Sequence, residues 1–327
     1  MTAVPVAMVR GASYKRGMPD ASPAQTTATT AALLADAQRV QRIALAALLA
    51  GAIGIAFSPI FVRLSELGPT ATAFWRVAFA VPALAAWIRL EPKGGRSRAP
   101  STRGDYLRLT AVGLFFAGDL AFWHWSIRFT SVANATLLAN FAPIFVTLVA
   151  WLVFKERFSR TFVLGLALAI GGAVVLMGRS LNVSTDALFG DALGLVTAMF
   201  YGGYILAVGK LRAEFSTATI MTWSGIVTAL ALLPIAVLSG ESLIASTASG
   251  WGVLLALALF SHAGGQSLIA YALAHLPAAF SSVSLLLQPA AAAVLAWVLL
   301  GEPLGPWQAV GAVVVLAGIL LARRGSR

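Results

Sequence analysis

The chain of 327 residues contains no cysteine and only three histidines, His124, His262 and His275. The lack of cysteine excludes disulfide bonds, thiolate metal sites and a cysteine nucleophile. The histidines do not form an HExxH motif, and no Gly-rich phosphate-binding loop is present. We therefore expect no enzymatic activity, no metal site, no cofactor and no direct drive by ATP.

Charged residues are also scarce: they make up 11% of the chain, whereas 59% is hydrophobic. The mean hydropathy is +0.86. A soluble globule needs far more polar surface, so this composition indicates an integral membrane protein. The net charge of +11 could also indicate nucleic-acid binding, and the positions of the basic residues decide between the two.

Apolar stretches of bilayer-spanning length predict an all-α membrane domain with ten transmembrane helices. We place these helices at residues 43–62, 70–90, 107–127, 132–154, 161–178, 188–209, 217–239, 251–273, 279–300 and 304–322.

The basic residues gather on one side of these spans. All of the 23 Lys and Arg except Arg63, Arg76, Arg128 and Arg179 fall in tails or loops that are cytoplasmic if the N-terminus is inside. The positive-inside rule then predicts a multi-pass protein of a bacterial-type inner (plasma) membrane with both termini cytoplasmic, and no nucleic-acid partner. Residues 1–42, before the first span, are expected to form a disordered cytoplasmic tail.

The second half of the chain repeats the first. Pro143, Trp151, Glu156, Gly165 and Gly172 recur 146 residues later as Pro289, Trp297, Glu302, Gly311 and Gly318, and an offset of 147 aligns the first two spans of each half. We assign the repeats to residues 43–178 and 188–322. Each holds five spans, and because five is odd the second repeat enters the bilayer inverted, which is typical of secondary transporters.

Two segments carry a resemblance to a known family. LGPTATAFWRVAFA (67–80) and NFAPIFVTLVAWLVFKERFS (140–159), with the counterpart QPAAAAVLAWVLLGEPLG (288–305), resemble the EamA-type drug/metabolite transporter superfamily. Lys155 and Pro303 depart from its pattern, since the family has Gly and Arg there. The resemblance implies two inverted five-helix repeats and export, and the length and aromatic third span are similar to the amino-acid and aromatic-amino-acid exporter branch.

Prolines fall near the middle of the fourth and ninth spans. Pro143 and Pro289 cannot donate a backbone hydrogen bond, so each should interrupt its helix and free the carbonyls of Ala139 and Leu285. Such backbone survives in a membrane where it faces protein or a watery cavity. Polar residues flank both breaks, and we select Asn140, Ser284 and Gln288 as candidate ligands; the alternative is that prolines and amides serve helix packing alone.

Asp119 lies deep in the third span, where a carboxylate is costly. Arg76 in the second span lies at a similar depth. One interpretation is a fixed salt bridge between the two spans; the other gives Asp119 a role in proton coupling or in binding a substrate ammonium group.

His262 and Gln266 lie one turn apart on the eighth span. They serve either as interhelical hydrogen-bonding partners or as cavity residues. Trp123 and Tyr204 are the aromatic residues that we select as contacts of an apolar or aromatic ligand.

The sequence thus predicts an exporter of small metabolites, above all apolar or aromatic amino acids, that works by alternating access through a cavity between the repeats. A drug or cationic-metabolite exporter remains an alternative, as does a membrane receptor or scaffold. The expected partners are a small-molecule substrate and the lipid bilayer. A homodimer is possible through the fifth and tenth spans, which carry Gly165, Gly172, Gly311 and Gly318.

Overall fold

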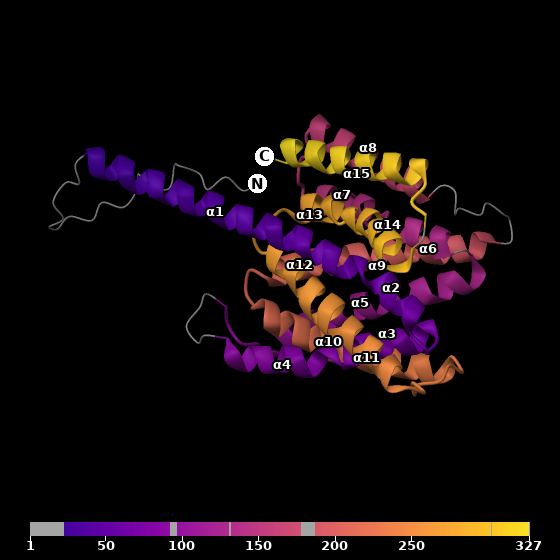
Figure 1. Cartoon of the computed structure of the whole chain (residues 1–327). Coiled ribbons are helices and arrows are strands. Elements are labelled where there is room, and N and C mark those ends of the chain that lie inside the picture. Colours follow the sequence, from indigo (N-terminus) through magenta and orange to yellow (C-terminus); the bar gives the residue numbers. More distant parts are fainter. Residues whose placement is uncertain (1–22, 92–96, 131, 178–186, 302, 327) are drawn as a thin grey trace.

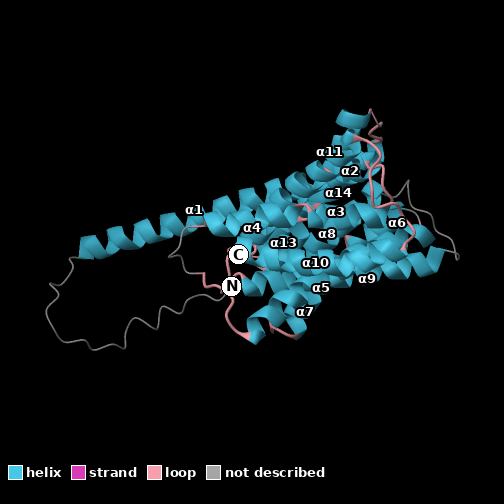
Figure 2. Cartoon of the chain, turned by 90° about the horizontal axis from the view of Figure 1, so that it is seen from below, coloured by secondary structure: helices cyan, strands magenta, loops and turns pink. Residues whose placement is uncertain are grey.

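The computed structural model describes residues 23–91, 97–130, 132–177, 187–301 and 303–326. Every regular element in these ranges is a helix, and they form one bundle (Figure 2). The first repeat contains α1 Pro23–Ala56, α2 Ser58–Leu64, α3 Pro69–Ala78, α4 Ala80–Leu90, α5 Arg103–Phe129, α6 Val132–Ala139, α7 Ala142–Leu152 and α8 Arg160–Met177.

The second repeat has the same succession of long and broken helices. It contains α9 Leu188–Leu211, α10 Thr217–Leu238, α11 Ala248–Ala256, a π-helical segment η4 Leu257–Gln266, α12 Ser267–Ala272, α13 Ala278–Ser284, α14 Leu287–Leu300 and α15 Pro306–Gly325.

Nine helical stretches within the described residues are long and apolar enough to cross a membrane. They agree with nine of the ten predicted spans. The remaining predicted span, 107–127, lies in α5, whose 27 residues include Asp105, Asp119 and three arginines. The chain is therefore an all-α, multi-pass integral membrane protein.

The fourth and ninth predicted spans are each broken in the middle. Asn140 and Phe141 separate α6 from α7, and Pro143 lies in the first turn of α7. Leu285 and Leu286 separate α13 from α14 in the same way. The predicted interruptions are confirmed, but the Leu285 carbonyl is not free, because it accepts the backbone N–H of Gln288 at 2.9 Å.

The two repeats meet most closely where α8 packs along α15, at one edge of the bundle (Figure 1). A β-carbon added to Gly165 or Gly172 would lie 2.3 Å from Ala322 N or 2.6 Å from Val315 N. The symmetry-related positions, Gly311 and Gly318, approach Leu176 and Ala169 just as closely. The glycine faces of α8 and α15 thus pack against each other within one chain. Small residues permit such a close approach of two backbones in membranes.

The start of α1 differs from the prediction of a disordered tail over residues 1–42. The helix begins at Pro23, so residues 23–42 are helical, and its first turns project beyond the bundle (Figures 1 and 2). Alanine recurs throughout this segment, and its high helix propensity lets the first span continue toward the N-terminus. Residues 1–22 lie outside the described part of the chain.

Candidate functional site

A cavity of about 550 Å³ lies between the two repeats. The first repeat lines it from α1, α2, α3, α5, α6 and α8, and the second from α9, η4, α14 and α15. Six of the predicted site residues reach its wall: Arg76, Asp119, Trp123, Asn140, Gln266 and Gln288.

Within the described part of the chain, Arg76 and Asp119 are the charged residues that line this cavity. They interact electrostatically, but they form no direct ion pair among those of the described residues. Arg76 Nε is buried without a hydrogen-bond partner in the described chain. The fixed salt bridge that the sequence left open is therefore not present in this structure, and each charge can bind a ligand group of opposite sign.

Three side-chain amides, Asn140, Gln266 and Gln288, line the cavity. Asn140 Nδ2 donates to the Thr136 carbonyl at 2.8 Å, which fixes the amide beside the end of α6. Gln266 Nε2 and Gln288 Nε2 are buried and have no hydrogen-bond partner in the described chain. Both glutamine side chains lie near the Tyr201 hydroxyl. Because a buried donor without a partner costs free energy, these groups are well suited to a polar ligand in the cavity.

The remaining cavity wall is mostly apolar. Phe116, Trp123 and Tyr201 supply aromatic rings, and Ala292, Ala293 and Leu257 supply aliphatic surface. An apolar wall with a few convergent polar groups is typical of small-molecule sites, whose volumes are roughly 300–1,000 Å³.

Four predicted site residues do not reach the cavity wall. His262 and Tyr204 lie behind Phe116, with ring centroids 5.3 Å and 4.9 Å from its ring. The Ser284 hydroxyl donates to the Phe280 carbonyl at 3.0 Å, and Pro143 is buried at the start of α7. Their role in binding a ligand stays a prediction, because the side that each residue presents to the cavity depends on how the helices pack.

The structure adds polar cavity residues that the sequence analysis did not select. They are Ser58, Thr72, His124, Thr136, Thr197, Tyr201 and Gln308. His124 lies near the end of α5, and its Nδ1 is hydrogen-bonded to the Leu120 carbonyl. Because His124 lies near the end of a span, the sequence alone does not indicate that it faces the cavity.

The cavity lies toward one face of the bundle. Val62 is near the end of α2, Thr72 near the start of α3, Met177 at the end of α8 and Gln308 near the start of α15. All four helix ends belong to the face that the positive-inside rule places outside.

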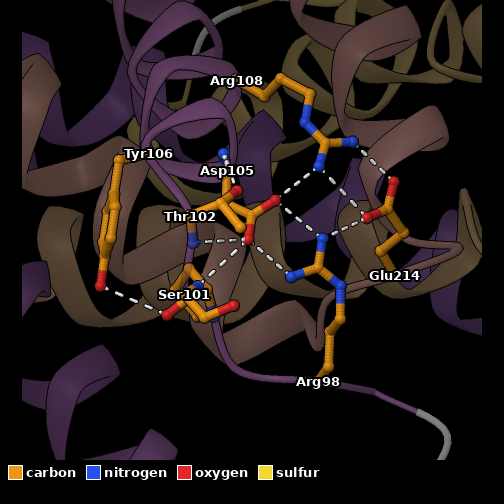
Figure 3. A network of polar contacts seen from close by, with 8 residues as sticks. Arg98, Ser101, Thr102, Asp105, Tyr106, Arg108 and Glu214 are labelled. Atoms are coloured by element: carbon orange, nitrogen blue, oxygen red, sulfur yellow. Dashed lines mark hydrogen bonds and ion pairs between the residues drawn. The ribbon is translucent and has the colours of Figure 1, made fainter.

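The opposite face carries a network of carboxylates and arginines (Figure 3). Arg98 binds Asp105 through two hydrogen bonds of 2.6 and 2.7 Å, and Glu214 at 2.6 Å. Arg108 also bridges the two acids. The network joins the α4–α5 connection to the α9–α10 connection, and the Arg98 guanidinium holds the pKa of Asp105 well below its usual range.

Carboxylates also link connections at the face toward which the cavity lies, through backbone N–H groups and, for Glu241, also through an ion pair with Arg128 at 3.1 Å. The Glu66 carboxylate, after α2, accepts the backbone N–H groups of Ser246 and Thr247 at 2.7 and 3.1 Å, just before α11. Glu241 accepts the N–H of Ala71 in the first turn of α3 at 2.9 Å. These carboxylates satisfy N–H groups at or near helix starts, where the helix dipole favours negative charge.

Comparison with known proteins agrees with this architecture. The model of the EamA-like transporter family matches the chain twice, at residues 42–178 and 188–324. The chain belongs to the EamA-like transporter family. Among the described residues, His, Asp and Glu do not gather in groups of three or more that could hold a metal ion.

Relatives of this EamA-family chain include named exporters. A probable terminal-alkyne amino-acid exporter of Streptantibioticus cattleyicolor is 32% identical over 82% of this chain and 89% of that protein. The threonine/homoserine exporter RhtA of Escherichia coli is 32% identical over 67% of this chain and 70% of its own length. One crystal structure superposes with a TM-score of 0.70 at 18% identity, covering 88% of this chain and 98% of the other, which shows a shared fold.

Proposed function

We propose that this EamA-family transporter exports amino acids, with a preference for apolar or aromatic side chains, through the cavity between its repeats. The observation that carries the proposal is the presence of Arg76 and Asp119 on one cavity wall without a direct ion pair.

A free amino acid carries a carboxylate and an ammonium group on adjacent atoms. Arg76 supplies donors for the carboxylate, and Asp119 supplies acceptors for the ammonium group. The unpartnered amide donors of Gln266 and Gln288 add neutral contacts. Phe116, Trp123 and Tyr201 then favour apolar or aromatic side chains.

The direction and class of transport are supported by the names of the relatives. An exporter of a terminal-alkyne amino acid and an exporter of threonine and homoserine both align over two thirds or more of this chain. Transport would be driven by an ion gradient or by the substrate gradient itself.

Alternating access requires that the two repeats rock about a central site. We assign α5 as a transmembrane helix in addition to the nine candidate spans of the described residues, which brings the total to ten. The chain then consists of two inverted five-helix repeats, at residues 43–178 and 188–322, with both termini cytoplasmic in an inner membrane. The cavity then faces outward, where an exporter releases its substrate. A homodimer would use the outer faces of α8 and α15, since their glycine faces are filled.

A cationic drug or metabolite is the second candidate, favoured by the carboxylate of Asp119 on the cavity wall. A pure cation leaves Arg76 as a repulsive neighbour, which is why the zwitterion fits better. A receptor or scaffold would bind a ligand here without moving it.

The test is counterflow of radiolabelled amino acids and organic cations in proteoliposomes, with and without a proton gradient. Saturable flux of apolar or aromatic amino acids is expected. Flux of cations alone would replace this proposal by the second candidate, and binding without flux would favour the receptor.

Topology can be tested separately, because the chain has no native cysteine. Single cysteines at the exposed positions Ser101 and Ser249, one on each face, should react with an impermeant thiol reagent from opposite sides of the membrane. Labelling of both from one side would contradict the ten-span arrangement.

A further inference from the structure

A second cavity of about 530 Å³ lies at the face where α1 enters the bundle and α15 ends. Its walls come from α1, the α12–α13 connection, the start of α13 and the end of α15. It shares none of its described lining residues with the central cavity.

Positive charge dominates this second cavity. Arg42 and Arg323 line it with His275, and among the described lining residues there is no carboxylate. Neither arginine forms an ion pair with another described residue. A guanidinium presents a rigid fork of donors that matches phosphate oxygens, so two of them in one cavity favour a phosphate group.

Neutral donors and an apolar floor complete the cavity. Gln38 and Gln41 add amide donors, while Leu45, Leu276 and Phe280 supply apolar surface. The Ser326 hydroxyl also lies at the wall, where it donates to the Arg323 carbonyl at 3.0 Å. The adjacent Ile43 on α1 is 47% exposed, on a helix that crosses the membrane. The cavity thus places two arginines next to an apolar surface that can contact lipid acyl chains.

The equivalent place in the first repeat is built differently. Thr130 and Asn134 correspond to Leu276 and Phe280 by the 146-residue offset. There Thr130 Oγ1 and Asn134 Nδ2 donate to Asp191 at 2.7 and 3.1 Å. In the first repeat a carboxylate with hydrogen-bond partners occupies this place, whereas the described lining of the second cavity contains arginines and no carboxylate.

We infer that the cavity of Arg42, His275 and Arg323 is a binding site for the phosphate headgroup of an anionic phospholipid. The apolar floor and the position at the membrane boundary favour a lipid over free phosphate. Basic pockets between transmembrane helices on the cytoplasmic side bind anionic headgroups in this way.

Native mass spectrometry of the full-length protein tests this site. Phosphatidylglycerol and phosphatidylcholine are titrated against the wild type and the double variant Arg42→Gln/Arg323→Gln. The matched control is Arg39→Gln/Arg324→Gln, which removes two exposed charges from the same helices outside the cavity. Loss of two charge-assisted hydrogen-bonding groups should weaken the affinity for the first bound phosphatidylglycerol by about tenfold or more. The affinity of the control variant should stay within about twofold of that of the wild type.

Three results would overturn the inference: equal weakening in both double variants, equal binding of the two lipids by the wild type, or displacement of phosphatidylglycerol by excess inorganic phosphate. The single variant Arg323→Gln serves if the double variant is not monodisperse on size exclusion. Arg42→Lys/Arg323→Lys, which retains the charge, should keep most of the affinity.

Discussion

The two repeats share a backbone plan but place their charges differently. Both have a broken span, α6–α7 in one and α13–α14 in the other, and both contribute a glycine face to the α8–α15 contact. Yet the positions that correspond to Arg76 and Asp119 in the second repeat are Trp223 and Gly265. The first repeat therefore brings the charges to the cavity, and the second brings the unpartnered amides of Gln266 and Gln288.

The same division appears at the two faces. Glu66 and Glu214 occupy corresponding loops, but Glu66 accepts N–H groups at a helix start whereas Glu214 binds arginines. The two repeats thus share the glycine contact that needs close backbone approach, while the side chains that line the cavity and those that link the connections at each face differ.

Removal of one cavity charge should have the largest effect. Asp119→Asn and Arg76→Gln should each weaken amino-acid transport by about tenfold to hundredfold, because a hydrogen bond to a charged group contributes roughly 1.5–3 kcal/mol. Counterflow in proteoliposomes measures it, with Asp36→Asn on the exposed part of α1 as the control. Full transport with unchanged affinity in both cavity variants would remove the zwitterion proposal.

The shared glycine contact can be broken with a matched pair of neighbours. Gly172→Ala should destabilise the protein by about 1–3 kcal/mol, since the new β-carbon would lie 2.6 Å from Val315 N. Gly171→Ala meets nothing within 4 Å and should be neutral or stabilising by about 0.5–1 kcal/mol. Thermal unfolding in detergent compares them, and equal melting temperatures would show that α8 and α15 are not in close contact.

The amides of the two repeats should matter less than the charges. Asn140→Leu and Gln288→Leu should each raise the KM by about threefold to tenfold, in line with a neutral hydrogen bond of roughly 0.5–1.5 kcal/mol. Because Asn140 already has a partner in Thr136, the larger change is expected for Gln288→Leu. Normal KM values in both variants would place the site elsewhere.

The smallest expected effect is a change in stability when a carboxylate at one of the two faces is replaced. The pKa of Glu214 is lowered by hydrogen bonds from Arg108 and Arg98, so its stabilising contribution is present above the ordinary carboxyl pKa of about 4 and is lost as the pH falls through the lower folded value. Melting curves of the wild type and Glu214→Gln should therefore differ by a constant amount above pH 5 and converge in stronger acid.

The stability changes caused by variants at the two faces should also differ in their dependence on salt. Added salt should shrink the penalty of Glu214→Gln, whose partners are charged, more than that of Glu66→Gln, whose partners are N–H and hydroxyl groups. Identical salt responses in the two variants would contradict the contrast between the faces.

Much of the fold followed from the sequence, because each signal is local. A bilayer demands long apolar helices, and a proline near the middle of a span removes a backbone donor whatever surrounds it. The candidate site was only partly predictable. Depth along a helix indicated Asp119 and Gln288, which line the cavity. The direction in which His262 and Tyr204 point, toward the ring of Phe116, depends on packing between helices.

The sequence by itself determined the membrane class, the duplication, the broken spans and the residues whose polarity is costly in hydrocarbon, since all of these depend on composition and spacing. Only the tertiary structure decided that Arg76 and Asp119 face one cavity without a direct ion pair, and that the glycine-lined faces of α8 and α15 pack against each other. Contacts between helices more than a hundred residues apart are set by how side chains interlock, and no local pattern records that geometry.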